Sequence, residues 1–166
     1  MTRAQRSASA PALRHLAAGL LLLAACGERE PPRAPDFVDL LNGYRRAAGV
    51  AAASKDERLA KAAAAHAAEM ERMGYWGHFS PTPANNSPDD RLAREGWPAD
   101  RHYFELLAAE DSAEAALRSW KAKPAYDRAL LDPACDVFGV ARRGRLWVLL
   151  LGLGATAAKH DTVTDR

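Results

Sequence analysis

Apolar residues with a helical period define the first predicted element, over residues 36–48. They recur three or four positions apart and therefore share one face of a helix: Phe37, Leu40, Leu41, Tyr44 and Ala48. Gly49 follows the last of them and is a typical residue for ending a helix. Arg45 and Arg46 lie off this stripe. We therefore expect a helix that packs its apolar face on a core and leaves both arginines outside it.

A second helix is predicted over residues 55–73, after a loop. Its apolar stripe consists of Leu59, Ala63, His66, Met70 and Met73. His66 thus lies on the buried face, where it is either a ligand to a bound group or a core histidine hydrogen-bonded to a backbone carbonyl. We favour the core histidine.

The stretch Gly74–Pro81 follows this helix directly and is the first candidate site. Its sequence, GYWGHFSP, surrounds His78 with glycines and aromatic residues. A helix-ending glycine followed by a titratable ring among aromatics suits a pocket. The same composition also occurs where a turn simply packs on a core.

Residues 87–108 predict a short helix and then a strand. Ser87 and Pro88 suit the cap and the first position of a helix, and Gly96 ends it. Residues 103–108 form an apolar run that contains Glu105. A carboxylate inside a short apolar strand has to be exposed, paired or functional. Glu105 is therefore a second candidate residue.

The last third of the chain predicts a helix followed by two strands. The helix begins at residues 111–114 and contains Trp120, before Pro124 interrupts it. Two apolar runs, 137–141 and 146–151, are joined by the sequence RRGR, which is the pattern of a β-hairpin. Together these elements predict an α+β fold in which helices cover a small antiparallel sheet.

The first 27 residues have the features of a bacterial lipoprotein signal. Arg3, Arg6 and Arg14 precede an apolar run over residues 16–25 that is too short to span a bilayer as a helix. The run ends in LAACG, which resembles a lipobox, where a lipid is attached to the cysteine, here Cys26. An ordinary secretory signal with a chance cysteine is the alternative.

The predicted organisation is a signal peptide at 1–25, a lipidated cysteine with a charged, proline-rich tether at 26–36, one domain at 37–153 and a flexible tail at 154–166. Such a chain is held on a membrane of the bacterial cell envelope by its lipid. Gly27, rather than aspartate, follows the cysteine and resembles lipoproteins of the outer membrane. The domain is then periplasmic or at the cell surface.

Charge and cysteine content narrow the partners. The chain has 23 basic and 21 acidic residues, and without residues 1–25 it keeps 20 basic and 21 acidic residues, a net charge of −1. This near-neutral balance argues against a nucleic-acid partner. If Cys26 is lipidated, Cys135 has no intramolecular partner, and we expect it to be a buried, inert thiol.

The order of short motifs between Phe37 and Gly152 resembles the short bacterial branch of the CAP superfamily (cysteine-rich secretory proteins, antigen 5 and plant pathogenesis-related proteins). The matching segments are LNGYR at 41–45, LAKAA at 59–63 with His66 and Met70, GY at 74–75, HFSP at 78–81, DRL at 90–92, Glu105, Trp120, LLDP at 130–133, GV at 139–140 and WV at 147–148. The resemblance implies a three-layer α-β-α sandwich.

Members of this superfamily carry a central cavity lined by two histidines and acidic residues, which in several cases binds a divalent metal. His78 matches the first histidine and Glu105 the first glutamate, whereas Tyr126 stands where the second histidine is expected. Leu106 also replaces the asparagine that normally follows the glutamate. The resemblance therefore implies a cavity at His78, Glu105 and Tyr126 with an incomplete set of ligands.

These departures weaken the case for a metal such as zinc. A phenol has a pKa of about 10 and must lose its proton before it binds a metal. One histidine and one carboxylate are fewer than the roughly three protein ligands of an open zinc site. Asp127 could substitute, whereas His102 is an odd number of positions from Glu105 and would face the other side of a strand. We expect no stable metal site, and His78 is the candidate ligand if a metal binds.

Three functions fit these patterns. We favour a lipid-anchored, non-enzymatic binding module of the cell envelope, whose partner is an envelope protein, a cell-wall component or a small apolar ligand. The alternative is a metal-dependent periplasmic or extracellular hydrolase, in which His78 holds metal or acts as base and Glu105 orients it or activates water. A domain that only packs or signals by contact is the third. In each case we expect Tyr75, Trp76 and Phe79 to wall the cavity.

Overall fold

The structure is a computed structural model that describes residues 36–154. The predicted signal peptide, Cys26, most of the tether and nearly all of the tail lie outside the described residues. Gly154, which the sequence placed in the tail, is still buried against the domain, and its backbone N–H is hydrogen-bonded to Asp136. No helix between residues 36 and 154 is long and apolar enough to cross a membrane.

Most of the helices and strands follow the sequence pattern, but that pattern did not predict the 3-10 helix at 83–85 or the helix that begins at Pro124, where proline occupies the first turn. In chain order they are α1 (Phe37–Ala47), β1 (Ser54–Lys55), α2 (Glu57–Met73), the 3-10 helix η1 (Pro83–Asn85), α3 (Pro88–Arg94), β2 (Tyr103–Ala109), α4 (Ala113–Lys121), α5 (Pro124–Leu130), β3 (Val137–Arg143) and β4 (Leu146–Gly152). Local signals set several of these ends. Gly74 ends α2 in the left-handed conformation at φ 66°, and Ser87 begins α3 with a capping box.

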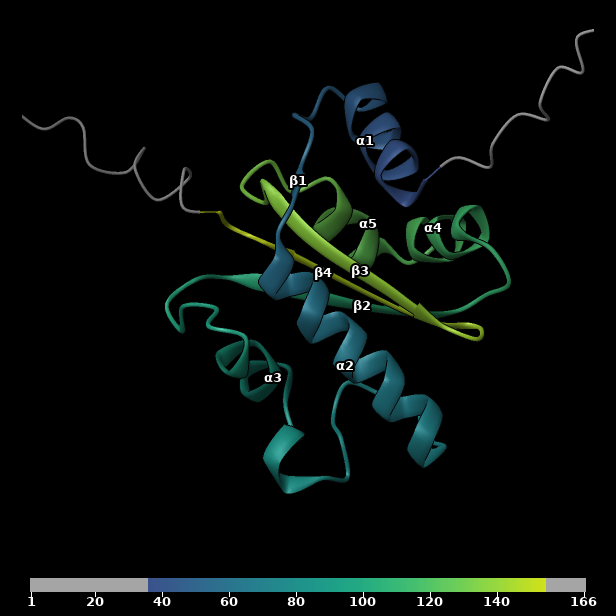
Figure 1. Cartoon of the computed structure of the whole chain (residues 1–166). Helices are drawn as coiled ribbons and strands as arrows, with labels where there is room; N and C mark the ends of the chain where they lie inside the picture. Colours follow the sequence, from purple (N-terminus) through teal and green to yellow (C-terminus); the bar gives the residue numbers. More distant parts are fainter. Residues whose placement is uncertain (1–35, 155–166) are drawn as a thin grey trace, which may run out of the picture. The chain divides into compact units, whose positions relative to one another are not determined.

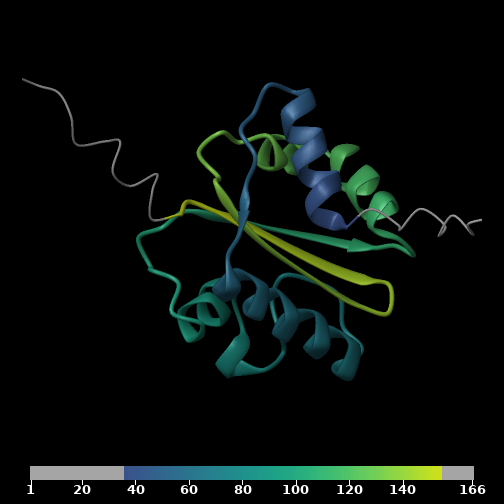
Figure 2. The same cartoon turned by 45° about the horizontal axis from the view of Figure 1, so that its top comes forward.

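The strands form one sheet in the order β1-β3-β4-β2, with helices on both faces (Figure 1). Helices α1, α4 and α5 cover one face, and α2 and α3 cover the other, which gives the three layers expected (Figure 2). The sheet is mixed rather than antiparallel, because β1 runs parallel to β3. The expectation of a purely antiparallel sheet missed β1 since its two residues are polar, exposed and too few to show a period.

Each face of the sheet has its own apolar core. The core under α1, α4 and α5 contains Trp120, which meets the ring of Phe37 edge-on at 5.7 Å. The core under α2 and α3 contains three alanines, a leucine and a methionine of α2, together with Leu107, Val148 and Leu150 of the sheet. Strand β4 is buried along nearly its whole length, as its continuous apolar run predicted.

Arg45 is not outside the core, as its place off the apolar stripe suggested, but is 1 % exposed. Its guanidinium donates to the backbone oxygens of Ala51, Leu130 and Cys135 at 2.7–2.8 Å. A buried arginine is tolerated where carbonyl oxygens surround it. These carbonyls come from distant parts of the chain, so no local pattern could reveal them. Cys135 is buried as expected, and burial raises the pKa of its thiol to about 12.

Candidate functional site

The candidate site lies at the edge of the sheet, on strand β2. This strand is the last in the sheet order, so side chains from the two faces can meet around it. Glu105 points to the face covered by α2 and α3, with Tyr103 and Leu107 on the same side. Phe104 and Leu106 alternate with them and pack on the other face.

Glu105 is a buried carboxylate that is paired on both oxygens. Its side chain is 3 % exposed and that of Arg91, from α3, is 2 % exposed. The Arg91 guanidinium donates to Oε1 at 3.1 Å and to Oε2 at 2.9 Å, and His78 Nδ1 lies 2.9 Å from Oε1. Burial pushes the pKa of Glu105 upward, but the hydrogen bond from His78 and the charge of Arg91 outweigh it and lower the pKa. Glu105 is therefore ionised and firmly held.

Arg91 also fixes the loop that carries His78. Besides Glu105, its guanidinium donates to the backbone oxygens of Asn85 at 3.0 Å and of His78 at 2.9 Å. One buried cation thus joins the start of α3, the loop and strand β2. The position of His78 depends on this side chain, although Arg91 itself faces no solvent.

Glu69 of α2 holds the same loop from the other side. It is 5 % exposed and accepts hydrogen bonds from the Tyr75 hydroxyl at 3.2 Å and from Asn85 Nδ2 at 3.3 Å. Burial raises its pKa, but hydrogen bonds from Thr82, Asn85, Ser80 and Tyr75 bring the pKa below its usual value. The loop is therefore tied to α2 as well as to α3.

His66 is the core histidine that we favoured. It is fully buried, and its Nε2 lies 3.0 Å from the backbone oxygen of Gly77, which can only accept a hydrogen bond. Burial lowers its pKa, against the opposing charge of Glu105, so the ring is neutral with its proton on Nε2. Its Nδ1 faces the Tyr75 hydroxyl at 3.3 Å. His66 lies beside Glu105, at 3.8 Å, but supports the loop instead of opening into the site.

His78 joins the two faces of the sheet. Because the Glu105 carboxylate only accepts, Nδ1 of His78 carries a proton, and in the neutral tautomer Nε2 is an acceptor. The Tyr126 hydroxyl, from α5, lies 3.2 Å from Nε2 and donates to it. Burial raises the pKa of Tyr126, and a hydrogen bond from the Leu107 backbone opposes this rise. Glu105, His78 and Tyr126, which we expected around one cavity, thus form a connected chain of hydrogen bonds, but His78 is not among the residues that line the pocket beside it.

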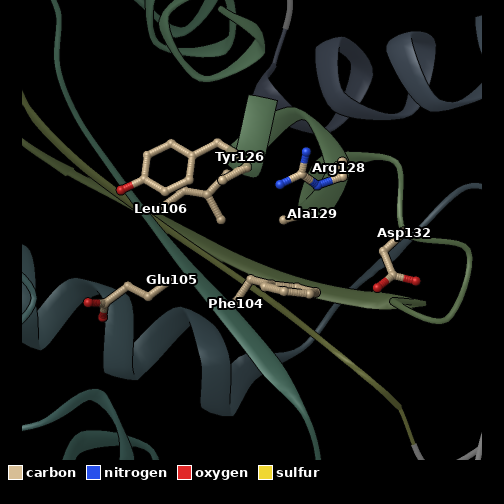
Figure 3. Close-up of a pocket in the computed structure, with 8 residues that line it drawn as sticks. Phe104, Glu105, Leu106, Tyr126, Arg128, Ala129 and Asp132 are labelled. Atoms are coloured by element: carbon tan, nitrogen blue, oxygen red, sulfur yellow. The ribbon is translucent and has the colours of Figure 1, made fainter. Parts of the chain in front are cut away.

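A pocket of about 350 Å³ opens beside this chain, between β2 and α5 (Figure 3). Its walls are mainly apolar and come from Phe104, Leu106, Ala125 and Ala129. Figure 3 shows the Tyr126 hydroxyl and the Glu105 carboxylate directed to one side, with Arg128 and Asp132 at the other. The arrangement suits a small ligand with an apolar body and a polar end.

The donor atoms do not suit a metal ion. Both oxygens of Glu105 accept from Arg91, and the nitrogens of His66 and His78 nearest to this carboxylate carry protons. The lone pair of His78 Nε2 accepts from the Tyr126 hydroxyl, and burial raises the pKa of that phenol, so it does not readily become a ligand. Among the described residues, no three His, Cys, Asp or Glu side chains are placed so that they could hold a metal ion. The residues present do not fit the metal that the family resemblance implies.

None of the three aromatic residues expected to wall the cavity, Tyr75, Trp76 and Phe79, lines this pocket. Trp76 is 51 % exposed and Phe79 is 68 % exposed, and neither lines the pocket. Their backbone carries them outward while Tyr75 turns in toward His66 and Glu69. Asp127, the possible substitute ligand, and His102 are both engaged elsewhere. Asp127 accepts from the Tyr44 hydroxyl at 2.6 Å, and the His102 ring packs edge-on against Phe104.

Arg91 and Glu69 are the site residues that the sequence did not single out. Two signals for Arg91 were available: its place in the DRL segment at 90–92, and the cation that a buried strand carboxylate at Glu105 requires nearby. Many basic residues satisfy that requirement equally in sequence. Glu69 lies on the helical face next to His66, three residues on, and no local pattern distinguishes it from a solvated glutamate.

Comparison with solved structures shows the same fold in bacterial proteins. An extracellular protein with an SCP domain from Bacillus anthracis is 24 % identical with a TM-score of 0.66, over 71 % of this chain and 39 % of that one. An outer surface protein from Borrelia burgdorferi is 17 % identical with a TM-score of 0.60, and the match covers 70 % of this chain and 89 % of that one. A cysteine-rich secretory protein from Staphylococcus aureus is 13 % identical with a TM-score of 0.55, and the match covers 71 % of this chain and 37 % of that one.

The chain therefore spans well under half of the length of the Bacillus and Staphylococcus proteins. No match was found among curated protein sequences. The family model described as "CAP: Cysteine-rich secretory protein family" matches residues 38–144, which is most of the domain and more than half of the chain. Together with the three-layer fold, this match shows that the chain belongs to the CAP family of cysteine-rich secretory proteins.

Proposed function

We propose that this chain is a lipid-anchored, non-enzymatic binding module of the bacterial cell envelope. In this proposal the pocket beside Tyr126 receives a small ligand with an apolar body, and no metal takes part. The LAACG motif at Cys26 supports the anchor. The solved relatives are described as an extracellular protein and an outer surface protein, which supports a place outside the cytoplasm.

One observation carries the non-enzymatic role. Every polar atom of Glu105 and both ring nitrogens of His78 have a hydrogen-bond partner within the protein. A metal ligand or a general base needs a lone pair that is available to the metal or the substrate. The charge of the Glu105 carboxylate is compensated by Arg91, and the His78 imidazole is hydrogen-bonded to the Tyr126 hydroxyl. This arrangement favours a stable binding surface over hydrolysis.

We expect zinc titration by calorimetry to show no tight site on the chain lacking residues 1–26. The reason is that zinc would have to displace the hydroxyl of Tyr126 from His78 Nε2 without gaining a second neutral ligand. Binding in the micromolar range that disappears in His78→Ala would contradict the proposal. That result would favour the metal-dependent hydrolase instead.

The variant Tyr126→His tests whether Tyr126 occupies the position of a missing metal ligand. An imidazole at position 126 would face His78 from α5 and add a neutral nitrogen ligand, so zinc affinity should rise to the micromolar range. The gain should vanish in Tyr126→His combined with His78→Ala. A folded Tyr126→His chain with no gain would mean that Tyr126 does not occupy a ligand position.

The anchor is tested separately by labelling with radioactive palmitate during expression in a bacterial host. We expect the full chain to be labelled and to remain in the membrane fraction, because the thiol of Cys26 carries the lipid. Cys26→Ser should lose the label, whereas Cys135→Ala should keep it, since Cys135 is buried in the domain. An unlabelled, freely secreted product of the full chain would reject the anchor.

A further inference from the structure

The segment Met73–Phe79 exposes large apolar side chains. Among the described residues, the exposed large hydrophobic side chains are Met73, Trp76 and Phe79, which are 40 %, 51 % and 68 % exposed. Single exposed apolar residues are common, but three within seven residues are not. The three other tryptophans of the chain, Trp97, Trp120 and Trp147, are at most 7 % exposed. This exposure is a local property of the segment.

The backbone of this segment is held in place. Gly74 takes a left-handed conformation, the backbone oxygen of Gly77 accepts from His66, and the backbone N–H of Ser80 donates to Asn86 at 2.8 Å. Tyr75 and Ser80 are turned into the domain, where both are hydrogen-bonded to Glu69. The loop therefore holds Trp76 and Phe79 outward. Their exposure requires no opening of the loop.

The segment starts at the end of the domain where the chain enters. Phe37, the first residue of α1, packs 6.3 Å from Trp147 at the beginning of β4. The β3–β4 turn at Gly144 lies next to Glu71 near the end of α2. Both views show the start of α1, the end of α2 and this turn at the same end of the sheet (Figures 1 and 2). Exposed Arg72 and Arg143 lie there beside exposed Glu71, and Arg72 forms an ion pair with Glu69 at 3.8 Å, so this end carries both signs of charge.

The occupant that fits these features is a lipid bilayer. Ten residues separate Cys26 from Phe37, which at most span roughly 35 Å when fully extended. A lipid on Cys26 would keep the start of α1 within that distance of the membrane. Tryptophan and other aromatic rings are favoured at the membrane–water interface, which is where the exposed rings of this segment would lie.

We propose that the segment Met73–Phe79 docks on the bilayer and places Trp76 and Phe79 in its interface. The proposal rests on the proposed anchor for its biological setting. Because His78 lies between these two aromatic residues in sequence, docking would hold the binding site close to the lipid surface. An apolar ligand could then be exchanged with the membrane over a short distance.

The test uses a chemical anchor, so that it does not depend on lipidation in the cell. Both apolar cores lie within residues 37–153, so the chain beginning at Cys26 keeps its whole core. Its N-terminal thiol is coupled to a maleimide lipid in vesicles of phosphatidylcholine and phosphatidylglycerol, while buried Cys135 is protected from coupling. Lipids brominated on their acyl chains then quench any tryptophan that enters the bilayer.

We expect bromine to quench tryptophan emission in the tethered chain and no longer to do so in Trp76→Ser. Phe79→Ser keeps the fluorophore and should lower the quenching by about twofold or more, because part of the inserted apolar surface is lost. The matched control Arg46→Ser changes an exposed arginine in the last turn of α1, which does not line the pocket, and should leave the quenching unchanged.

Absence of quenching in the tethered, folded chain would overturn the proposal and leave the segment as a surface for a protein partner. Equal quenching in Phe79→Ser would overturn insertion by both aromatic residues. Neither outcome bears on the palmitate experiment, which tests the natural anchor. A failed labelling experiment would in turn leave the quenching result intact.

Discussion

Replacing Arg91 by methionine is expected to lower the free energy of unfolding by about 3–5 kcal/mol, because removing one partner leaves a buried charge without compensation. Glu105 is 3 % exposed, and Arg91 is the cation that contacts both of its oxygens. The same substitution frees the backbone oxygens of Asn85 and His78. Urea unfolding followed by circular dichroism measures the change.

The double variant Arg91→Met with Glu105→Gln separates the charge from the packing. It removes both members of the ion pair, so part of the lost stability should return. Arg118→Met, an exposed arginine on α4, serves as the control and should change the stability little. A single Arg91→Met variant as stable as the wild type would contradict the view of Arg91 as the residue that compensates Glu105.

The pH dependence of this variant gives a second measurement. In the wild type the pKa of Glu105 is lowered, so its contribution to stability is present above the unfolded pKa and is lost as the pH falls through the folded value. Without Arg91, one of the interactions that lower the pKa of Glu105 is lost, so burial raises this pKa. Ionised Glu105 then destabilises the fold as the pH rises. The deficit of Arg91→Met should therefore be larger at about pH 7 than at about pH 4.

Replacing Gly139 by alanine is expected to lower the free energy of unfolding by about 3 kcal/mol or more, because there is no room for the added Cβ atom. A Cβ at this position of β3 would lie 2.1 Å from the backbone nitrogen of Ala60 and 2.2 Å from the carbonyl carbon of Leu59. Backbone atoms cannot rotate aside as a side chain can. Helix α2 would have to move off the sheet, and His66 and Glu69 with it.

Gly43→Ala is the matched control for this change. Gly43 lies inside α1 and nothing would come within 4 Å of its Cβ, so alanine should stabilise the helix by roughly 0.5–1 kcal/mol. Thermal unfolding of the two variants should therefore shift the midpoint in opposite directions. A Gly139→Ala protein that unfolds at the wild-type temperature would show that α2 can retreat without loss of packing.

These two substitutions also show how the site is built. Gly139 allows α2 to approach the sheet closely, and α2 then presents Glu69 and His66 to the loop. Arg91 closes the loop over Glu105 from α3. His78 is placed by this framework at the edge of β2, where it can reach Tyr126 on the opposite face. The conformation of the site is thus a consequence of the packing of the layers.

Local features of the sequence were enough to determine most of the helices and strands. The apolar period of α1, the left-handed Gly74 after α2, the capping box at Ser87 and the β3–β4 hairpin each depend on residues that are close together in the chain. Such signals act through local backbone conformation and amphipathic burial. The order of the motifs also identified the family, and it pointed to His78, Glu105 and Tyr126, which the structure joins by hydrogen bonds.

The tertiary structure alone decided how the polar residues are satisfied. Arg45 and Arg91 look like surface residues in sequence, and each becomes buried because carbonyl or carboxylate oxygens from distant segments converge on it. Trp76 and Phe79 look like cavity walls, and the loop held by Glu69 and Arg91 turns them outward. Pairing of a buried charge and exposure of an aromatic ring depend on contacts between residues far apart in the chain. Periodicity and spacing describe only near neighbours, so they required Glu105 to be exposed, paired or functional, and the packing of α3 on β2 made it paired.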